Sequence, residues 1–126
     1  AVGIENLKVS DAVVDRHKSN GAFYNRELDA VDGVTLLKNE PDYDSAYWIY
    51  SMKVEDQDGF MKAMADRGIA VSRVHERNDL HTTVADHRTA LPVLDSVIKK
   101  MICIPSGWWV SDEDREYVVE QIKRGW

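Results

Sequence analysis

Apolar residues recur at helical spacing along the first quarter of the chain. Between residues 7 and 31 they lie three, four or seven positions apart, which predicts one long amphipathic helix over this range. The stripe consists of Leu7, Val14, His17, Gly21, Tyr24, Leu28 and Val31. Asn20–Gly21 lies inside it without flanking strands, so we expect a kink or close packing at Gly21 rather than a hairpin. Gly33 suits the left-handed conformation that ends a helix.

Four short stretches of apolar, β-branched and aromatic residues predict strands. The strongest is Ala46–Val54, in which the two-residue period places Trp48, Tyr50, Met52 and Val54 on one face. The other three are Val34–Leu37, Ala70–Val74 and Met101–Ile104. Residues 39–45 contain Pro41 and three acidic side chains, which indicates a loop.

A helix and an irregular segment are predicted around the third strand. Asp56 can cap a helix that ends at Gly68. The apolar residues of this helix are Phe60, Ala63 and Met64. Residues 82–90 have no clear period and predict irregular structure or a short helical turn.

Two more helices are predicted in the last third of the chain. Pro92 suits the first turn of a helix, whose apolar residues are Leu94, Val97, Ile98 and Met101. Residues 106–109 predict a loop, and Ser111 with Asp114 resembles a capping box. The final helix ends near Gly125, and its inward-facing residues are Val118, Val119 and Ile122.

The order of these elements predicts an α/β fold of the α+β type. A long helix is followed by two strands, a helix, a strand, a helix, a short strand and a helix. We expect a small mixed or antiparallel sheet of three to four strands, covered by helices. Because 126 residues suffice for one hydrophobic core but not for two, we expect a single domain over residues 1–126.

Charge and composition exclude several classes of partner. The formal net charge of -6 argues against a nucleic-acid partner, since phosphate binding needs a basic face. No apolar run approaches the roughly 20 residues that span a membrane. Cys103 is the single cysteine and cannot form an internal disulfide, so we expect a cytoplasmic location.

Three histidines form a candidate metal cluster. His75, His81 and His87 are six residues apart, and Asp79 and Asp86 lie near them. This spacing does not match helical ligand motifs, in which two histidines share a face four residues apart. We therefore favour three polar loop residues over a metal site.

A second candidate site lies at the end of the third predicted strand. If the segment stays extended, Arg73, His75 and Arg77 share a face and could hold a phosphate or carboxylate. The alternative is a solvated strand end in which Glu76 pairs with an arginine. The residues alone favour this alternative.

Other polar and aromatic residues have structural interpretations. His17 lies on the apolar stripe of the first helix and reads as a partly buried, hydrogen-bonded histidine. Cys103, between two isoleucines, reads as a packed thiol. Trp108 and Trp109 could stack on a ligand, but packing against a neighbouring surface is more common for such a pair.

Four segments, taken in order, give the chain a resemblance to a known family. They are residues 3–28 (GIENLKVSDAVVDRHKSNGAFYNREL), 33–37 with 46–54 (GVTLL, AYWIYSMKV), 65–81 (ADRGIAVSRVHERNDLH) and 91–122 (LPVLDSVIKKMICIPSGWWVSDEDREYVVEQI). Together they resemble the C-terminal small domain of the DegT/StrS-type sugar aminotransferases, which are pyridoxal-phosphate enzymes of the aspartate-aminotransferase fold. The resemblance covers nearly the whole chain and depends on the order of the segments.

The resemblance implies an enzyme that moves an amino group from glutamate or glutamine onto a keto-sugar linked to a nucleotide. The cofactor, pyridoxal 5'-phosphate, would be bound by a large domain that these residues do not contain, since none of the eight lysines lies in a Ser- and Gly-rich segment. The resemblance therefore implies that this chain is inactive alone, has no catalytic or cofactor-binding residue of its own, and works within a homodimer when full length.

The resemblance also suggests which residues contact the substrate. The family's small domain closes over the active site and contributes the histidine of a His-Tyr-Pro motif, which corresponds to His75 here. Glu76 stands where tyrosine is usual and Arg77 where proline is usual, and an acidic group favours recognition of hydroxyl or amino groups. Further candidates for the same pocket are Arg73, Asn78 and His81. The alternative function is a stand-alone α/β module that binds small anions or regulates another protein.

Overall fold

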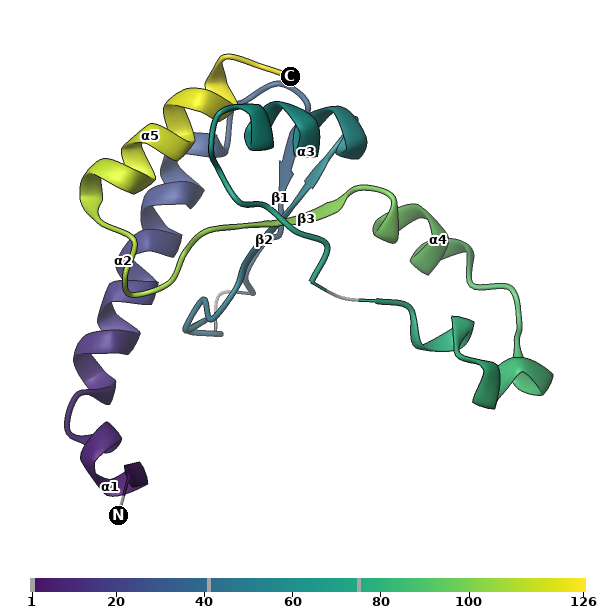
Figure 1. Cartoon of the computed structure of the whole chain (residues 1–126), viewed down its shortest axis with the longest axis horizontal. Helices are drawn as coiled ribbons and strands as arrows, with labels where there is room; N and C mark the ends of the chain where they lie inside the picture. Colours follow the sequence, from purple (N-terminus) through teal and green to yellow (C-terminus); the bar gives the residue numbers. More distant parts are fainter. Residues whose placement is uncertain (1, 41, 75) are drawn as a thin grey trace.

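Three helices, α2, α3 and α5, cover one face of a three-stranded antiparallel sheet in the computed structural model, which describes residues 2–40, 42–74 and 76–126 (Figure 1). The elements are α1 (Val2–Leu7), α2 (Ser10–Leu28), β1 (Val34–Leu36), β2 (Tyr50–Val54), α3 (Gln57–Asp66), the 3-10 turns η1 (Asn78–Leu80) and η2 (Thr82–His87), α4 (Pro92–Ile98), β3 (Met101–Ile104) and α5 (Asp112–Lys123). The sheet order is β1-β2-β3, so the predicted α+β fold is confirmed.

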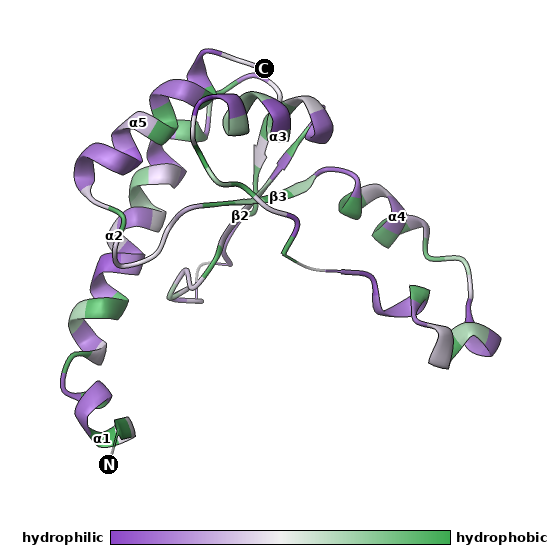
Figure 2. Cartoon of the chain, in the orientation of Figure 1, coloured by the Kyte–Doolittle hydropathy of each residue, from purple (hydrophilic) through white to green (hydrophobic). Residues whose placement is uncertain are grey.

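The hydrophobic core lies between the helices and one face of β2 and β3. Tyr50, Met52 and Val54 alternate inward on β2, as the two-residue period predicts, and all are nearly inaccessible to solvent. They meet apolar side chains of the three covering helices, namely Tyr24, Leu28, Phe60, Met64, Val118, Val119 and Ile122. Outside this contact layer the covering helices are largely hydrophilic (Figure 2).

The first helix is confirmed in its centre and differs at its start. The backbone leaves helical geometry at Val9, and the hydroxyl of Ser10 donates to the carbonyl of Leu7 (2.9 Å), so α1 and α2 are separate helices. The prediction that Leu7 belongs to the buried stripe is wrong, because its side chain is 71% exposed.

Gly21 confirms the expected close packing within α2. A Cβ atom at this position would lie 2.4 Å from Cγ of the Tyr47 ring, so only glycine lets the loop before β2 approach the helix.

The strongest predicted strand is shorter than its sequence suggests. β2 begins at Tyr50 rather than Ala46, because Tyr47 adopts a positive φ of 47° that interrupts the extended chain. Trp48 therefore does not share the buried face, and its side chain is 78% exposed. β1 (Val34–Leu36) and β3 (Met101–Ile104) pair with β2 as short strands at nearly the predicted positions.

The predicted strand Ala70–Val74 is wrong. This segment touches the sheet at a single antiparallel bridge, in which Ser72 and Cys103 exchange two backbone hydrogen bonds of 3.1 and 2.9 Å. Beyond Ser72 the chain leaves the sheet edge, so no ladder forms. Residues 73–74 and 76–80 do not extend the sheet.

Both predicted helix caps are confirmed. The Asp56 carboxylate accepts from the backbone N–H of Gly59 (3.0 Å) at the start of α3. Ser111 and Asp114 form a reciprocal capping box at the start of α5, with hydrogen bonds of 3.0 and 3.1 Å.

Residues 76–98 project from the helix-covered sheet, and we call this segment the arm (Figure 1). It contains η1, η2 and α4, which confirms the predicted irregular segment and the helix beginning at Pro92. None of the residues 76–98 is fully buried, and residues 81–90 are all exposed. Met101 is not part of this helix, because the helix ends at Ile98 and Met101 begins β3.

Candidate functional site

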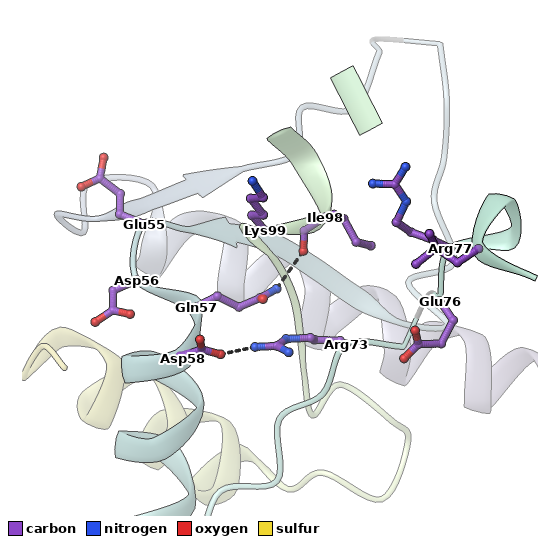
Figure 3. Close-up of a pocket in the computed structure, with 10 residues that line it drawn as sticks. Glu55, Asp56, Gln57, Asp58, Arg73, Glu76, Arg77, Ile98 and Lys99 are labelled. Carbon is purple, nitrogen blue, oxygen red and sulfur yellow. Dashed lines mark hydrogen bonds and ion pairs between the residues drawn. The ribbon is translucent and has the colours of Figure 1, made fainter. Parts of the chain in front are cut away.

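A pocket of about 560 Å³ lies where the arm joins the sheet (Figure 3). The start of α3, the chain after Ser72 and the end of α4 surround it. Its lining is largely charged and includes Glu55, Asp58, Arg73, Glu76, Arg77 and Lys99.

The structure brings some of the predicted substrate-binding residues together and separates others. Arg73 and Glu76 both line the pocket. Asn78 lines a different pocket of about 240 Å³ on the arm, and His81 is exposed at the end of η1. His75 lies outside the described residues.

Arg73 connects the pocket to α3. Its guanidinium forms an ion pair with the carboxylate of Asp58 in the first turn of that helix, and Figure 3 shows the two side chains meeting across the pocket. The neighbouring Gln57 donates to the carbonyls of Ile98 (3.2 Å) and Met101 (2.5 Å). These bonds fix the start of α3 against the end of α4, so one wall of the pocket is held in place.

Arg77 binds two carboxylates from different parts of the arm. Its Nε and Nη2 donate to Asp79 at 2.9 and 2.7 Å, and its Nη1 forms an ion pair with Asp95 in α4. The hydrogen bonds from Arg77 hold the pKa of the Asp79 carboxyl below its usual value, and the two carboxylates raise the pKa of Arg77.

These ion pairs disfavour the small-anion site suggested by Arg73, His75 and Arg77. Both guanidiniums already bind carboxylates of this chain, so a free phosphate would have to compete with Asp58, Asp79 and Asp95. No local pattern predicts Asp58 and Asp95 as partners, because they lie 15 and 18 positions from their arginines.

Among the charged groups of the pocket, Glu55, Glu76 and Lys99 remain available for a ligand. No described residue lies within ion-pairing distance of the Glu55 and Glu76 carboxylates or of the Lys99 ammonium. A carboxylate accepts hydrogen bonds from hydroxyl and amino groups, and an ammonium donates them. The pocket can therefore bind a polyhydroxylated or amino-bearing molecule.

The histidine cluster is not assembled among the residues that the structure describes. Within residues 2–40, 42–74 and 76–126, no three His, Cys, Asp or Glu side chains come close enough together to hold a metal ion. His81 and His87 are both exposed on the arm.

The structural interpretations of His17 and Cys103 are confirmed. His17 is 8% exposed, and its Nδ1 lies 3.0 Å from the carbonyl oxygen of Tyr47. Cys103 is buried, with its Sγ 3.3 Å from the hydroxyl of Ser51.

The two tryptophan rings contact each other, and the Trp109 ring also packs over Gly107. The rings of Trp108 and Trp109 meet edge to face, with centroids 6.0 Å apart, and the two residues remain 57% and 68% exposed.

None of the eight lysines is fully buried, and the environments of Lys18 and Lys62 do not favour attachment of pyridoxal phosphate. A lysine that forms a Schiff base needs a lowered pKa, which burial or a nearby cation provides. Hydrogen bonds to Asp44 and Asp66 instead raise the pKa of Lys18 and Lys62. Lys8 and Lys123 also pair with carboxylates, while Lys38, Lys99 and Lys100 are exposed and Lys53 lies half-buried on β2.

The sequence model of the DegT/DnrJ/EryC1/StrS aminotransferase family matches residues 1–123. The chain belongs to this family. Aminotransferases of this family depend on pyridoxal phosphate. Within the described ranges, no helix is both long and apolar enough to cross a membrane.

Solved structures and a curated relative agree with this assignment. The chain is 46% identical to the sugar aminotransferase CalS13 from Micromonospora echinospora (TM-score 0.95). The match covers 98% of this chain and 34% of CalS13. The chain is 43% identical to AtS13 from Actinomadura melliaura (TM-score 0.95; 98% and 33% covered). It is also 27% identical to the erythromycin biosynthesis sensory transduction protein EryC1 from Saccharopolyspora erythraea over 115 residues, which are 87% of this chain and 31% of that protein. The chain thus spans about a third of the length of these relatives.

Proposed function

We propose that this chain is the C-terminal small domain of a pyridoxal-phosphate-dependent sugar aminotransferase. The observation that carries the proposal is the 46% identity and TM-score of 0.95 to a solved sugar aminotransferase over 98% of the chain. The enzyme transfers an amino group from glutamate or glutamine to a keto-sugar linked to a nucleotide. It acts as a cytoplasmic homodimer.

The cofactor is held by a part of the enzyme outside these residues. Pyridoxal phosphate supplies the electron sink for amino transfer. The pairing and exposure of the lysines in this chain support a binding site elsewhere. The domain described here supplies surface that closes over the active site, and its pocket beside the arm faces the sugar.

Within that pocket we assign roles by chemistry. The Glu76 carboxylate accepts hydrogen bonds from sugar hydroxyls or from the new amine, because no described residue neutralises it. Arg73 lines the same pocket, and its ion pair with Asp58 orients the Arg73 side chain. The proposed set of substrate contacts also contains His75, Asn78, which lines the second pocket on the arm, and His81, which is exposed at the end of η1.

The experiment compares two polypeptides. One contains these residues together with the cofactor domain, and the other is the 126-residue chain alone. The longer polypeptide should bind pyridoxal phosphate with its characteristic visible absorbance and convert a nucleotide-linked keto-sugar to the amino sugar with glutamate as donor. The isolated chain should do neither. A longer polypeptide that binds no cofactor would contradict the proposal.

The first prediction concerns the substrate contacts. In the longer polypeptide, Glu76→Gln and His75→Ala should each raise KM for the sugar nucleotide by about tenfold, since each removes a polar contact worth about 1–2 kcal/mol. Steady-state kinetics measure this change, and cofactor absorbance should be unaffected. Glu116→Gln on the exposed surface of α5 is the matched control with unchanged KM. Equal kinetics in all three variants would remove Glu76 and His75 from the site.

A further inference from the structure

The arm has no hydrophobic core of its own. None of the residues 76–98 is fully buried, and α4 contains no buried residue. Its two 3-10 turns hold only short-range backbone bonds, such as Leu80 N to Arg77 O (3.3 Å) and His81 N to Asn78 O (3.2 Å). Within these residues, the contacts that join distant positions of the arm come from polar side chains.

Arg77 is the centre of these polar contacts. The arm leaves the sheet through residues 76–80 and returns through α4, and Arg77 binds Asp79 on the outgoing side and Asp95 on the returning side. The side chains of Arg77 and Asp79 are only 17% and 20% exposed, which makes this pair stronger than an ordinary surface ion pair. Lysine cannot replace it, because a single ammonium cannot reproduce the two parallel bonds to Asp79 and a third to Asp95.

A second arginine strengthens the same turn. Arg88 donates from Nε to the carbonyl of Asp79 (2.8 Å) and from Nη2 to the carbonyl of Leu80 (2.7 Å). Asp79 is thus held through its side chain by Arg77 and through its backbone by Arg88. The turn between residues 77 and 81 is therefore held by the side chains of Arg77, Arg88 and Asp95.

Two proposed substrate contacts are the immediate neighbours of Arg77 in the chain. Glu76 precedes it, lines the pocket and has no ion-pairing partner among the described residues, and Asn78 follows it at the start of η1. When the guanidinium is fixed at both carboxylates, the backbone on either side of it is fixed as well. The direction in which Glu76 enters the pocket therefore depends on Arg77.

We propose that Arg77 is a positioning residue, which clamps the turn at Asn78–Leu80 to α4 through Asp79 and Asp95 and thereby holds Glu76 in the pocket. This inference rests on the proposed function for its catalytic consequence, while the clamp itself can be tested without activity. Arg77 also lines the pocket, but its guanidinium is occupied by Asp79 and Asp95, so in this proposal it acts through its neighbours.

The first test measures hydrogen exchange in the longer polypeptide that carries the cofactor domain. Arg77→Ala should raise the exchange rates of the amides of Leu80, His81 and Val84 by about tenfold, while those of β2 and α3 stay unchanged. Asp95→Asn, which keeps the side-chain shape, should give a smaller increase at the same amides. Asp66→Asn breaks the exposed Lys62–Asp66 pair and is the matched control, with no change in the arm. Unchanged exchange in the arm of Arg77→Ala would overturn the clamp.

The second test distinguishes a positioning role of Arg77 from a purely structural one. Arg77→Ala and Asp95→Asn should raise KM for the sugar nucleotide about tenfold and about threefold, respectively, with kcat within about twofold of the parent enzyme. Faster exchange in the arm with an unchanged KM would overturn the positioning role. If the parent polypeptide catalyses no amino transfer, the proposed function fails, and the exchange rates alone decide whether the clamp exists.

Discussion

The helix-covered sheet and the arm are stabilised by different forces. In the sheet region, Tyr24, Leu28, Met52, Phe60, Met64, Ile102 and Ile122 have no accessible surface. In the arm no described residue is fully buried, and Arg77, Arg88, Asp79 and Asp95 make the contacts that shape it. Apolar burial therefore stabilises the helix-covered sheet, and ion pairs stabilise the arm. Removing a buried apolar side chain should affect the sheet more, and neutralising a charge should affect the arm more.

The largest expected effect comes from the core. Phe60 is fully buried and meets Trp126 edge to face, with ring centroids 5.0 Å apart, so Phe60→Ala should lower the free energy of unfolding by about 3–5 kcal/mol. Denaturant titration measures this loss. Val93→Ala in the arm, where the side chain is 75% exposed, should change it by less than about 0.5 kcal/mol. Similar losses for the two variants would mean that the arm is part of the same core.

Alkaline pH should act on the core as well. Burial raises the pKa values of Tyr24 and Tyr50 above their ordinary value, so both stay neutral in the folded protein when the unfolded chain would ionise. Their contribution is complete below about pH 10 and is lost as the pH rises above that value, by up to about 1.4 kcal/mol per pH unit for each tyrosine. Denaturant titration between pH 8 and 11 measures the slope. Tyr43→Phe, at an exposed tyrosine, is the control that leaves the slope unchanged. A flat profile to pH 11 would contradict the burial of these phenols.

Acid should act on the arm with a smaller effect. Arg77 holds the pKa of Asp79 below its usual value, so the carboxylate stabilises the folded arm above the unfolded pKa, near pH 4, and this contribution is lost as the pH falls through the lower folded value. Exchange in the arm, corrected for the intrinsic rate, should be constant from pH 7 to 5 and rise below about pH 4. The amides of β2 should remain protected at the same pH. A rise already at pH 6 would point to a histidine instead of Asp79.

Local patterns predicted the sheet region well, because its signals lie within a few residues. The alternation of Tyr50, Met52 and Val54 follows from the two-residue period, and the cap at Asp56 follows from one side chain and the turn after it. The start of β2 could not be predicted, since the positive φ of Tyr47 accompanies its packing against Gly21 of a distant helix. The same limit explains Ala70–Val74, which has the composition of a strand but only one bridging partner.

The sequence indicates which segment carries the candidate residues, but not which contacts they make. The sequence pointed to the polar residues after position 72, and the structure places Arg73 and Glu76 of that group in one pocket. The partners of the arginines, Asp58 and Asp95, lie in other helices, and only the fold brings them to Arg73 and Arg77. Both arginines therefore pair with carboxylates of this chain, which neither interpretation of the sequence included.

Amino transfer by the longer polypeptide tests the central claim most directly. With pyridoxal phosphate, glutamate and a nucleotide-linked keto-sugar, we expect the amino sugar to form at a rate that depends on Glu76, with KM raised about tenfold in Glu76→Gln. A polypeptide that binds the cofactor yet yields no amino sugar from any keto-sugar nucleotide, or a Glu76→Gln variant that matches the parent enzyme, would contradict the account.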